Sequence, residues 1–98
     1  MGNRIHLDEV YHKVKGKDVY RWSAKDKDTK YRLYGKLTEK RDYETGAKPL
    51  FIHIKKLCYS QFLERKKLNK KIRFVTDKLA HYKKGFKKYF RNVSDLTH

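Results

Sequence analysis

The spacing of apolar residues changes once along this chain, near Pro49, and the change limits the folds open to it. Before Pro49, three runs rich in β-branched and aromatic residues are separated by short polar turns. The runs cover residues 5–11, 19–24 and 31–37. Because connections this short cannot cross over a sheet, they favour an antiparallel meander of three strands.

After Pro49 the apolar residues recur mainly at helical spacing. Residues 43–49 are expected to form a loop or a frayed helix start. A first helix is predicted from about Leu50 to Arg65, and Pro49 suits its first turn. Its apolar residues at helical spacing are Leu50, Ile54, Leu57, Cys58 and Phe62. The short apolar run Ile72–Asp77 predicts a buried strand. A second helix follows, with Asn92–Ser94 as the candidate start of one more strand. Its predicted apolar face consists of Leu79, Tyr82, Phe86, Tyr89 and Phe90.

The predicted element order is therefore β-β-β-α-β-α, with one further strand as a candidate. The chain has no internal repeat, low-complexity tract or linker. Ninety-eight residues suit about one small domain with a modest core. We therefore expect a single α/β domain over residues 1–98.

Positive charge is concentrated in the second half of the chain. The net charge is +16, of which residues 1–50 contribute +5 and residues 51–98 contribute +11. Such asymmetry predicts a polyanionic partner, most simply nucleic acid. The lysines on the polar side of the second helix are the candidate contacts to a DNA backbone, although a solvated helix face would look the same: Lys78, Lys83, Lys84, Lys87 and Lys88.

Cysteine and hydropathy exclude several classes of protein. Cys58 is the single cysteine, so a disulfide framework and a cysteine-based zinc site are both excluded, and a buried structural role is expected for it. No apolar stretch approaches the roughly 20 residues that a membrane span needs. The N-terminus has no signal-peptide pattern. We expect a cytoplasmic protein with no membrane partner.

Two carboxylates stand out from this basic background. Asp77 is the only acid between Arg65 and Arg91, and it ends the fourth predicted strand, whereas Asp8 lies in the first. If these two strands are neighbours, both carboxylates can meet at one edge of the sheet. Oxygen ligands of this kind suit Mg²⁺ or Mn²⁺, which also take phosphate oxygens from a substrate. Asp77 could equally be an acid at the N-terminus of the following helix or a salt-bridge partner.

Several short segments, in order, resemble the catalytic domain of prokaryotic insertion-sequence transposases of the DDE type. The segments are HLDEVY at 6–11, VKGK at 14–17, YRWSAKD at 20–26, KRD at 40–42 and VTDKLAHY at 75–82. The resemblance implies a ribonuclease-H-like fold with a mixed sheet. It also implies that Asp8 and Asp77 are the first two catalytic, metal-binding aspartates, and that the chain cleaves and joins DNA with Mg²⁺ or Mn²⁺.

The resemblance stops short of the family's third acidic residue, a glutamate on a helix after the fifth strand. Asp95 is the only acid beyond Asp77 and precedes that position, and the family's N-terminal DNA-binding segment has no counterpart. We therefore expect a truncated core, incomplete at its C-terminus and inactive alone. The alternatives are a non-catalytic basic module that binds RNA or DNA, and a homo-oligomer in which a second copy covers an open apolar face.

Other polar residues near these segments are expected to have structural roles. Glu9 points to the face opposite Asp8 and is expected to pair with a lysine in solvent. His6 shares the face of Asp8, where a structural role is more common than a metal ligand. His81 is a weak candidate for a phosphate contact. Asp26, Asp28 and Asp42 are expected to hydrogen-bond locally in turns.

Overall fold

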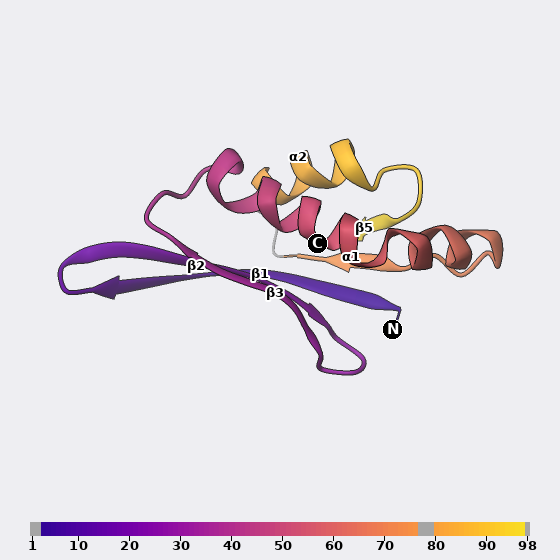
Figure 1. Ribbon diagram of the computed structural model, residues 1–98, viewed down its shortest axis with the longest axis horizontal. Helices are drawn as coiled ribbons and strands as arrows, with labels where there is room; N and C mark the ends of the chain where they lie inside the picture. The colour runs from indigo at the N-terminus through magenta and orange to yellow at the C-terminus, as the bar shows by residue number, and fades with distance from the viewer. Residues whose placement is uncertain (1–2, 77–79, 98) are drawn as a thin grey trace.

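The structure, a computed structural model, describes residues 3–76 and 80–97. These residues form one five-stranded sheet with two α-helices on the same side of it (Figure 1). The elements are β1 (Arg4–Val14), β2 (Lys17–Asp26), β3 (Arg32–Thr38), the π-helical turn η1 (Tyr43–Ala47), α1 (Lys48–Lys67), β4 (Arg73–Val75), α2 (Ala80–Tyr89) and β5 (Asp95–Thr97).

The sheet is mixed, with the strand order β3-β2-β1-β4-β5. The first three strands form an antiparallel meander, as predicted. β4 lies beside β1 and runs parallel to it, and β5 in turn runs parallel to β4. The first and fourth strands are therefore neighbours, which is the arrangement that a shared site for Asp8 and Asp77 requires.

Aromatic side chains fill the space between the sheet and the helices. Phe74 of β4 lies 4.9 Å from Phe90 and 5.5 Å from Phe62, measured between ring centroids. Trp22 of β2 meets Tyr82 of α2 edge to face at 5.8 Å, and the Trp22 indole donates a 2.8 Å hydrogen bond to Thr38. All these rings are fully buried, so they supply much of the apolar burial that joins the two layers.

The helix faces agree with the predicted pattern, apart from one distortion in α1. In α2, Tyr82 and Phe86 are buried and Tyr89 is half-buried. In α1, the backbone leaves helical geometry at Cys58, where φ is −145°. Leu57, expected in the core, is exposed beside this kink, whereas Cys58 is buried as predicted.

Three boundaries differ from the predictions. α1 is preceded by the π-helical turn η1 where a loop or frayed helix start was expected. β4 pairs only over Arg73–Val75, and Asp77 lies outside the described residues. The last strand is Asp95–Thr97 and not Asn92–Ser94, because the backbone amides of Val93 and Ser94 both bond to the Phe90 carbonyl and form a turn after α2.

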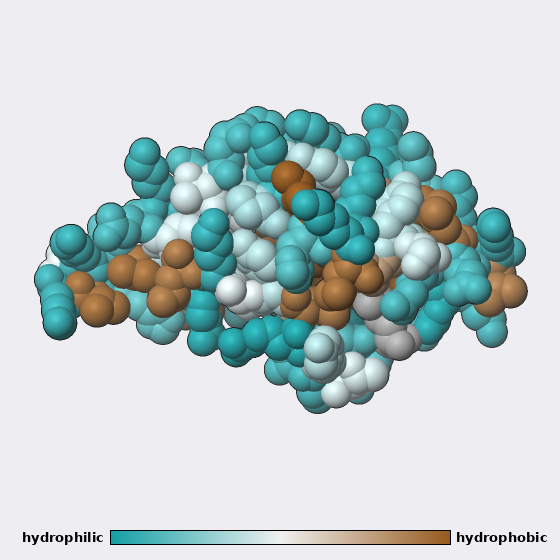
Figure 2. All heavy atoms as spheres, viewed as in Figure 1, coloured by the Kyte–Doolittle hydropathy of each residue, from teal (hydrophilic) through white to brown (hydrophobic). Residues whose placement is uncertain are grey.

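The face of the molecule seen in Figure 2 is mainly hydrophilic. The β1–β2 hairpin projects beyond the helices, so the apolar residues near its tip are exposed (Figures 1 and 2). Val14, for example, is 50% exposed. Within 3–76 and 80–97, neither helix combines the length and the apolar character needed to cross a membrane.

Candidate functional site

Asp8 lies in the middle of β1 on the face of the sheet that the helices leave uncovered. Its neighbour Leu7 is fully buried on the helix side, and alternation along a strand places Asp8 on the opposite face. The Asp8 backbone is nevertheless tied to the helix layer, because the Tyr82 hydroxyl of α2 donates a 2.6 Å hydrogen bond to the Asp8 carbonyl. A core aromatic residue therefore fixes the strand at the position of the candidate carboxylate.

The register between β1 and β4 relates the sequence positions of Asp8 and Asp77. The last parallel pair joins His6 of β1 to Val75 of β4. Asp8 follows His6 by two residues, and Asp77 follows Val75 by two residues. Because Asp77 lies outside the described residues, a shared site for the two carboxylates stays a prediction.

Basic residues surround Asp8 on the uncovered face. Ser23 of β2 lies directly opposite Asp8, and Arg21 and Lys25 are the diagonal neighbours on the same face. Diagonal neighbours in an antiparallel ladder lie about 7–8 Å apart. His6 pairs with Lys25 on the same face and is exposed. The surroundings of Asp8 thus combine one carboxylate with side chains that suit phosphate.

The candidate lysines of α2 lie elsewhere. Lys83, Lys84, Lys87 and Lys88 are exposed, as predicted, on the side of α2 away from the core. The Lys84 ammonium lies 4.5 Å from the centre of the Tyr43 ring. Because α2 covers the other face of the sheet, these lysines are separated from Asp8 by the helix layer and the sheet (Figure 1). Lys78 lies outside the described residues.

A second basic region lies where β1 and β4 begin, and we call it the basic hollow. It is an open depression of about 490 Å³ lined by Asn3, Arg4, Asp28, Lys70, Lys71 and Arg73. Lys70 and Lys71 are adjacent in the sequence. The sequence did not indicate that Arg4 lies near them, because Arg4 is 66 residues away from Lys70. The pairing of β1 with β4 brings these residues together.

The other four acidic residues singled out in the sequence fall into two groups. Asp26 and Asp42 bond locally, as predicted: Asp26 accepts from the amides of Asp28 and Thr29, and Asp42 caps η1 by accepting from the Thr45 amide. The hydrogen bonds from Thr45 hold the pKa of Asp42 below its ordinary value.

Glu9 and Asp28 make long-range contacts that were not expected. The Glu9 side chain is only 8% exposed and accepts a 2.9 Å bond from Arg41, so the expected pairing with a lysine in solvent was wrong. Asp28 pairs with Arg4 at 2.9 Å and also accepts from the Asn3 amide at 2.7 Å. These bonds, chiefly the one from Arg4, hold the pKa of Asp28 below its ordinary value.

The metal chemistry open to these residues is that of a hard cation. Over 3–76 and 80–97, no three His, Cys, Asp or Glu side chains gather closely enough to hold an ion on their own. The Asp8 side chain is half-buried and has no hydrogen bond or ion pair in that part of the chain. Mg²⁺ and Mn²⁺ are bound through one or two carboxylates with water and phosphate oxygens, so the free Asp8 carboxylate fits such an ion, whereas the nearby cationic side chains suit the phosphate.

Comparison with known proteins adds two findings. The sequence of residues 2–98 matches a protein family described as the DDE domain of IS240-type transposases. Among solved structures, the catalytic domain of Mos1 mariner transposase has a similar fold, with a TM-score of 0.62 and 15% sequence identity. That match covers 98% of this chain and 49% of the other, so this chain spans about half the length of the matched structure. No curated protein matches in sequence.

Proposed function

This chain belongs to the DDE domain family of transposases, and on that premise we propose that it is a DNA-processing core whose Asp8 and Asp77 hold one divalent metal ion. Its fold is ribonuclease-H-like. The proposed chemistry is cleavage of a phosphodiester bond and transfer of the resulting DNA end. In a two-ion site, one Mg²⁺ or Mn²⁺ would activate the attacking oxygen and the other would stabilise the leaving oxygen, and the two aspartates would hold one of these ions.

The observation that carries this proposal is the parallel pairing of β1 with β4. Both aspartates follow the last paired residues, His6 and Val75, by the same number of positions. Two neighbouring parallel strands that carry a carboxylate at equivalent positions present both groups to one place. Asp8 would supply its oxygen from a strand that Tyr82 holds in position.

The basic side chains around Asp8 are proposed to hold the DNA phosphates. Arg21 is the most informative of them, because its Nε is buried and donates no hydrogen bond within the described part of the chain. A phosphate oxygen at the uncovered face would supply the missing acceptor once the half-buried Arg21 side chain turns outward. Lys25, on the other diagonal, would neutralise a second phosphate charge.

We further propose that these 98 residues do not complete the reaction alone. Asp95 is the only acid in the sequence beyond Asp77, and it sits in the edge strand β5 as the partner of Arg73. A third carboxylate would have to come from chain outside these residues or from another molecule. Metal binding and DNA binding are therefore better tests than turnover.

The first test is calorimetric titration with Mn²⁺ and Mg²⁺. The two variants Asp8→Asn and Asp77→Asn should each weaken binding more than about tenfold, because each removes one of two charged ligands. Glu39→Gln is the matched control, since it removes one exposed carboxylate that lies outside the proposed site. Equal binding by Asp8→Asn and the wild-type chain would contradict the proposed site.

A non-catalytic basic module is the second candidate function. The observation in its favour is the α2 lysine face, which lies on the other side of the sheet from Asp8. In such a module the aspartates have no link to function. Both aspartate variants would then bind nucleic acid as well as the wild-type chain or slightly better, and the wild-type chain would give no metal signal in the titration.

A further inference from the structure

We propose that the basic hollow binds the phosphodiester backbone of DNA beside the Asp8 site, on the same face of the sheet. The proposal rests on the DNA-processing function above and adds to it a binding subsite at the start of β1 and β4. Its ligand is a run of phosphates in one DNA strand, and its recognition is independent of sequence because it involves charge alone.

The charges of the hollow favour an anion. Four of its six lining residues are cations, and Asp28 is the only acid among them. Asp28 is already engaged with Arg4. Over the described residues, Lys70, Lys71 and Arg73 form no ion pair, and Asp95 of the adjacent strand forms none with Arg73. Three cations therefore remain to neutralise a polyanion.

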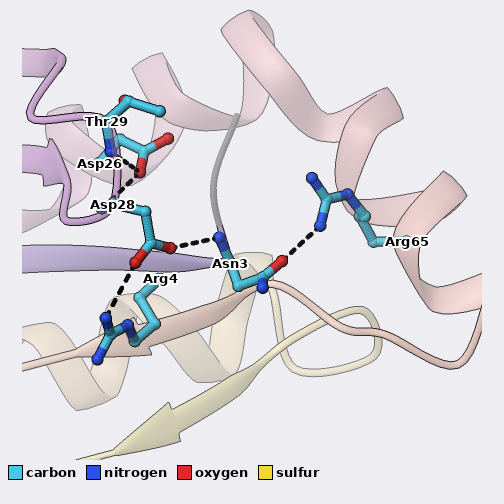
Figure 3. A network of polar contacts seen from close by, with 6 residues as sticks. All are labelled: Asn3, Arg4, Asp26, Asp28, Thr29 and Arg65. Carbon is cyan, nitrogen blue, oxygen red and sulfur yellow. Dashed lines mark hydrogen bonds and ion pairs between the residues drawn. The ribbon is translucent and has the colours of Figure 1, made fainter.

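The hollow is held in shape by a network around Asn3 (Figure 3). The Asn3 backbone amide donates a 2.7 Å hydrogen bond to the Asp28 carboxylate, and the Asn3 side-chain oxygen accepts a 2.5 Å bond from Arg65 of α1. The Asn3 carbonyl accepts from the Arg73 amide at 2.8 Å. Asn3 thus links the turn after β2, the helix α1 and the strand β4, so binding a phosphate here requires little reorganisation.

The position of the hollow connects it to Asp8. Arg4 of β1 is paired with Arg73 of β4. The residues that follow them, Ile5 and Phe74, are both buried on the face that packs against the helices. Both arginines therefore lie on the uncovered face, as Asp8 does. Asp8 follows Arg4 by four positions along β1, which is about 13 Å. A DNA strand that places one phosphate at Asp8 can therefore continue along β1 to the hollow.

The test compares two triple variants in DNA binding. Lys70→Ala/Lys71→Ala/Arg73→Ala removes the three unpaired cations of the hollow. Lys13→Ala/Lys15→Ala/Lys17→Ala removes three exposed cations from the tip of the β1–β2 hairpin and is the charge-matched control. Binding of a fluorescent DNA duplex is followed by anisotropy at several salt concentrations, in parallel with the wild-type chain.

The hollow variant should bind at least about tenfold more weakly, and its slope of log K against log salt should fall by about 2 to 3, since each lost phosphate contact removes about 0.9. The hairpin control should change the slope by less than about 1. Equal losses in the two triple variants would overturn the subsite while leaving DNA binding itself intact. No binding by the wild-type chain would instead overturn the proposed function.

A second variant protects the test against loss of folding. Lys70→Gln/Lys71→Gln changes only two exposed residues in the connection before β4 and leaves Arg73 in the sheet. It should reduce the salt slope by about 2 and leave the circular dichroism spectrum unchanged. An unchanged slope in this folded variant would also overturn the subsite.

Discussion

Asp28 and Asp8 are both carboxylates in a strongly basic chain, yet their surroundings differ. Asp28 is exposed but accepts bonds from Arg4 and the Asn3 amide. Asp8 is half-buried and has no such partner in the described part of the chain. Asp28 therefore belongs to the scaffold of the basic hollow, whereas the Asp8 carboxylate remains available to a metal ion.

The engagement of Asp28 predicts a pH dependence of stability. Its pKa is lowered in the folded chain, so it stabilises the fold above the ordinary pKa of an aspartate, about 3.9, and this contribution is lost as the pH falls through the lower folded value. The difference in Tm between wild type and Asp28→Asn should be constant from pH 7 to 5 and shrink below about pH 4. A difference that grows on acidification would contradict the bonding.

Two glycines show how closely the residues pack. A Cβ at Gly46 would lie 2.0 Å from the Trp22 ring, and one at Gly85 would lie 2.3 Å from the Phe51 ring, whereas a Cβ at Gly35 would meet only the flexible Arg32 side chain at 3.5 Å. Close approach of backbone to a ring therefore requires glycine at the first two positions.

We expect Gly46→Ala and Gly85→Ala each to lower the free energy of unfolding by about 1–3 kcal/mol, through overpacking. Gly35→Ala should be neutral or stabilising by less than about 1 kcal/mol. Urea denaturation followed by tryptophan fluorescence, which reports on Trp22, measures all three. Loss of stability in Gly35→Ala alone would contradict the packing described.

At the scale of elements, α1 departs from its sequence pattern at a single point. The kink at Cys58 leaves Leu57 exposed and buries the thiol, which donates to the Ile54 carbonyl at 3.2 Å. Burial raises the pKa of Cys58 to about 11. Helical spacing correctly predicted the helix and the burial of Cys58. Because it assumes a regular helix, it wrongly predicted that Leu57 is buried.

The buried thiol should react slowly with alkylating reagents. At pH 8 a thiol with so high a pKa is at least about a hundredfold less ionised than a free cysteine, and access is also blocked. Native protein should therefore be labelled by iodoacetamide at least about a hundredfold more slowly than urea-unfolded protein. Labelling at the rate of a free thiol would show that the second half of α1 is not packed as described.

At the scale of the whole molecule, local patterns were predictable and distant pairings were not. Runs of β-branched and aromatic residues joined by short turns predicted the meander, and helical periodicity predicted the lysine face of α2. The strand that was predicted to start at Asn92 begins at Asp95, because hydrogen bonds to the Phe90 carbonyl first complete a turn. The hollow and the Glu9–Arg41 pair were missed because they join residues far apart in sequence through the register of the sheet.

The residues proposed to bind metal and DNA share the uncovered face of the sheet. Asp8, Arg21 and Lys25 lie on it, and the arginines of the hollow lie on the same face at the start of β1 and β4. The central claim is that Asp8 and Asp77 share one divalent ion on this face.

Broadening of backbone amide NMR signals by Mn²⁺ tests that claim most directly, because the paramagnetic ion reports where it is bound. At low Mn²⁺, signals from residues around Asp8 and Ser23 should broaden first, and Asp8→Asn and Asp77→Asn should each abolish the effect. Broadening centred on another acid, such as Glu64 or Asp95, or broadening around Asp8 that persists in Asp77→Asn, would contradict it.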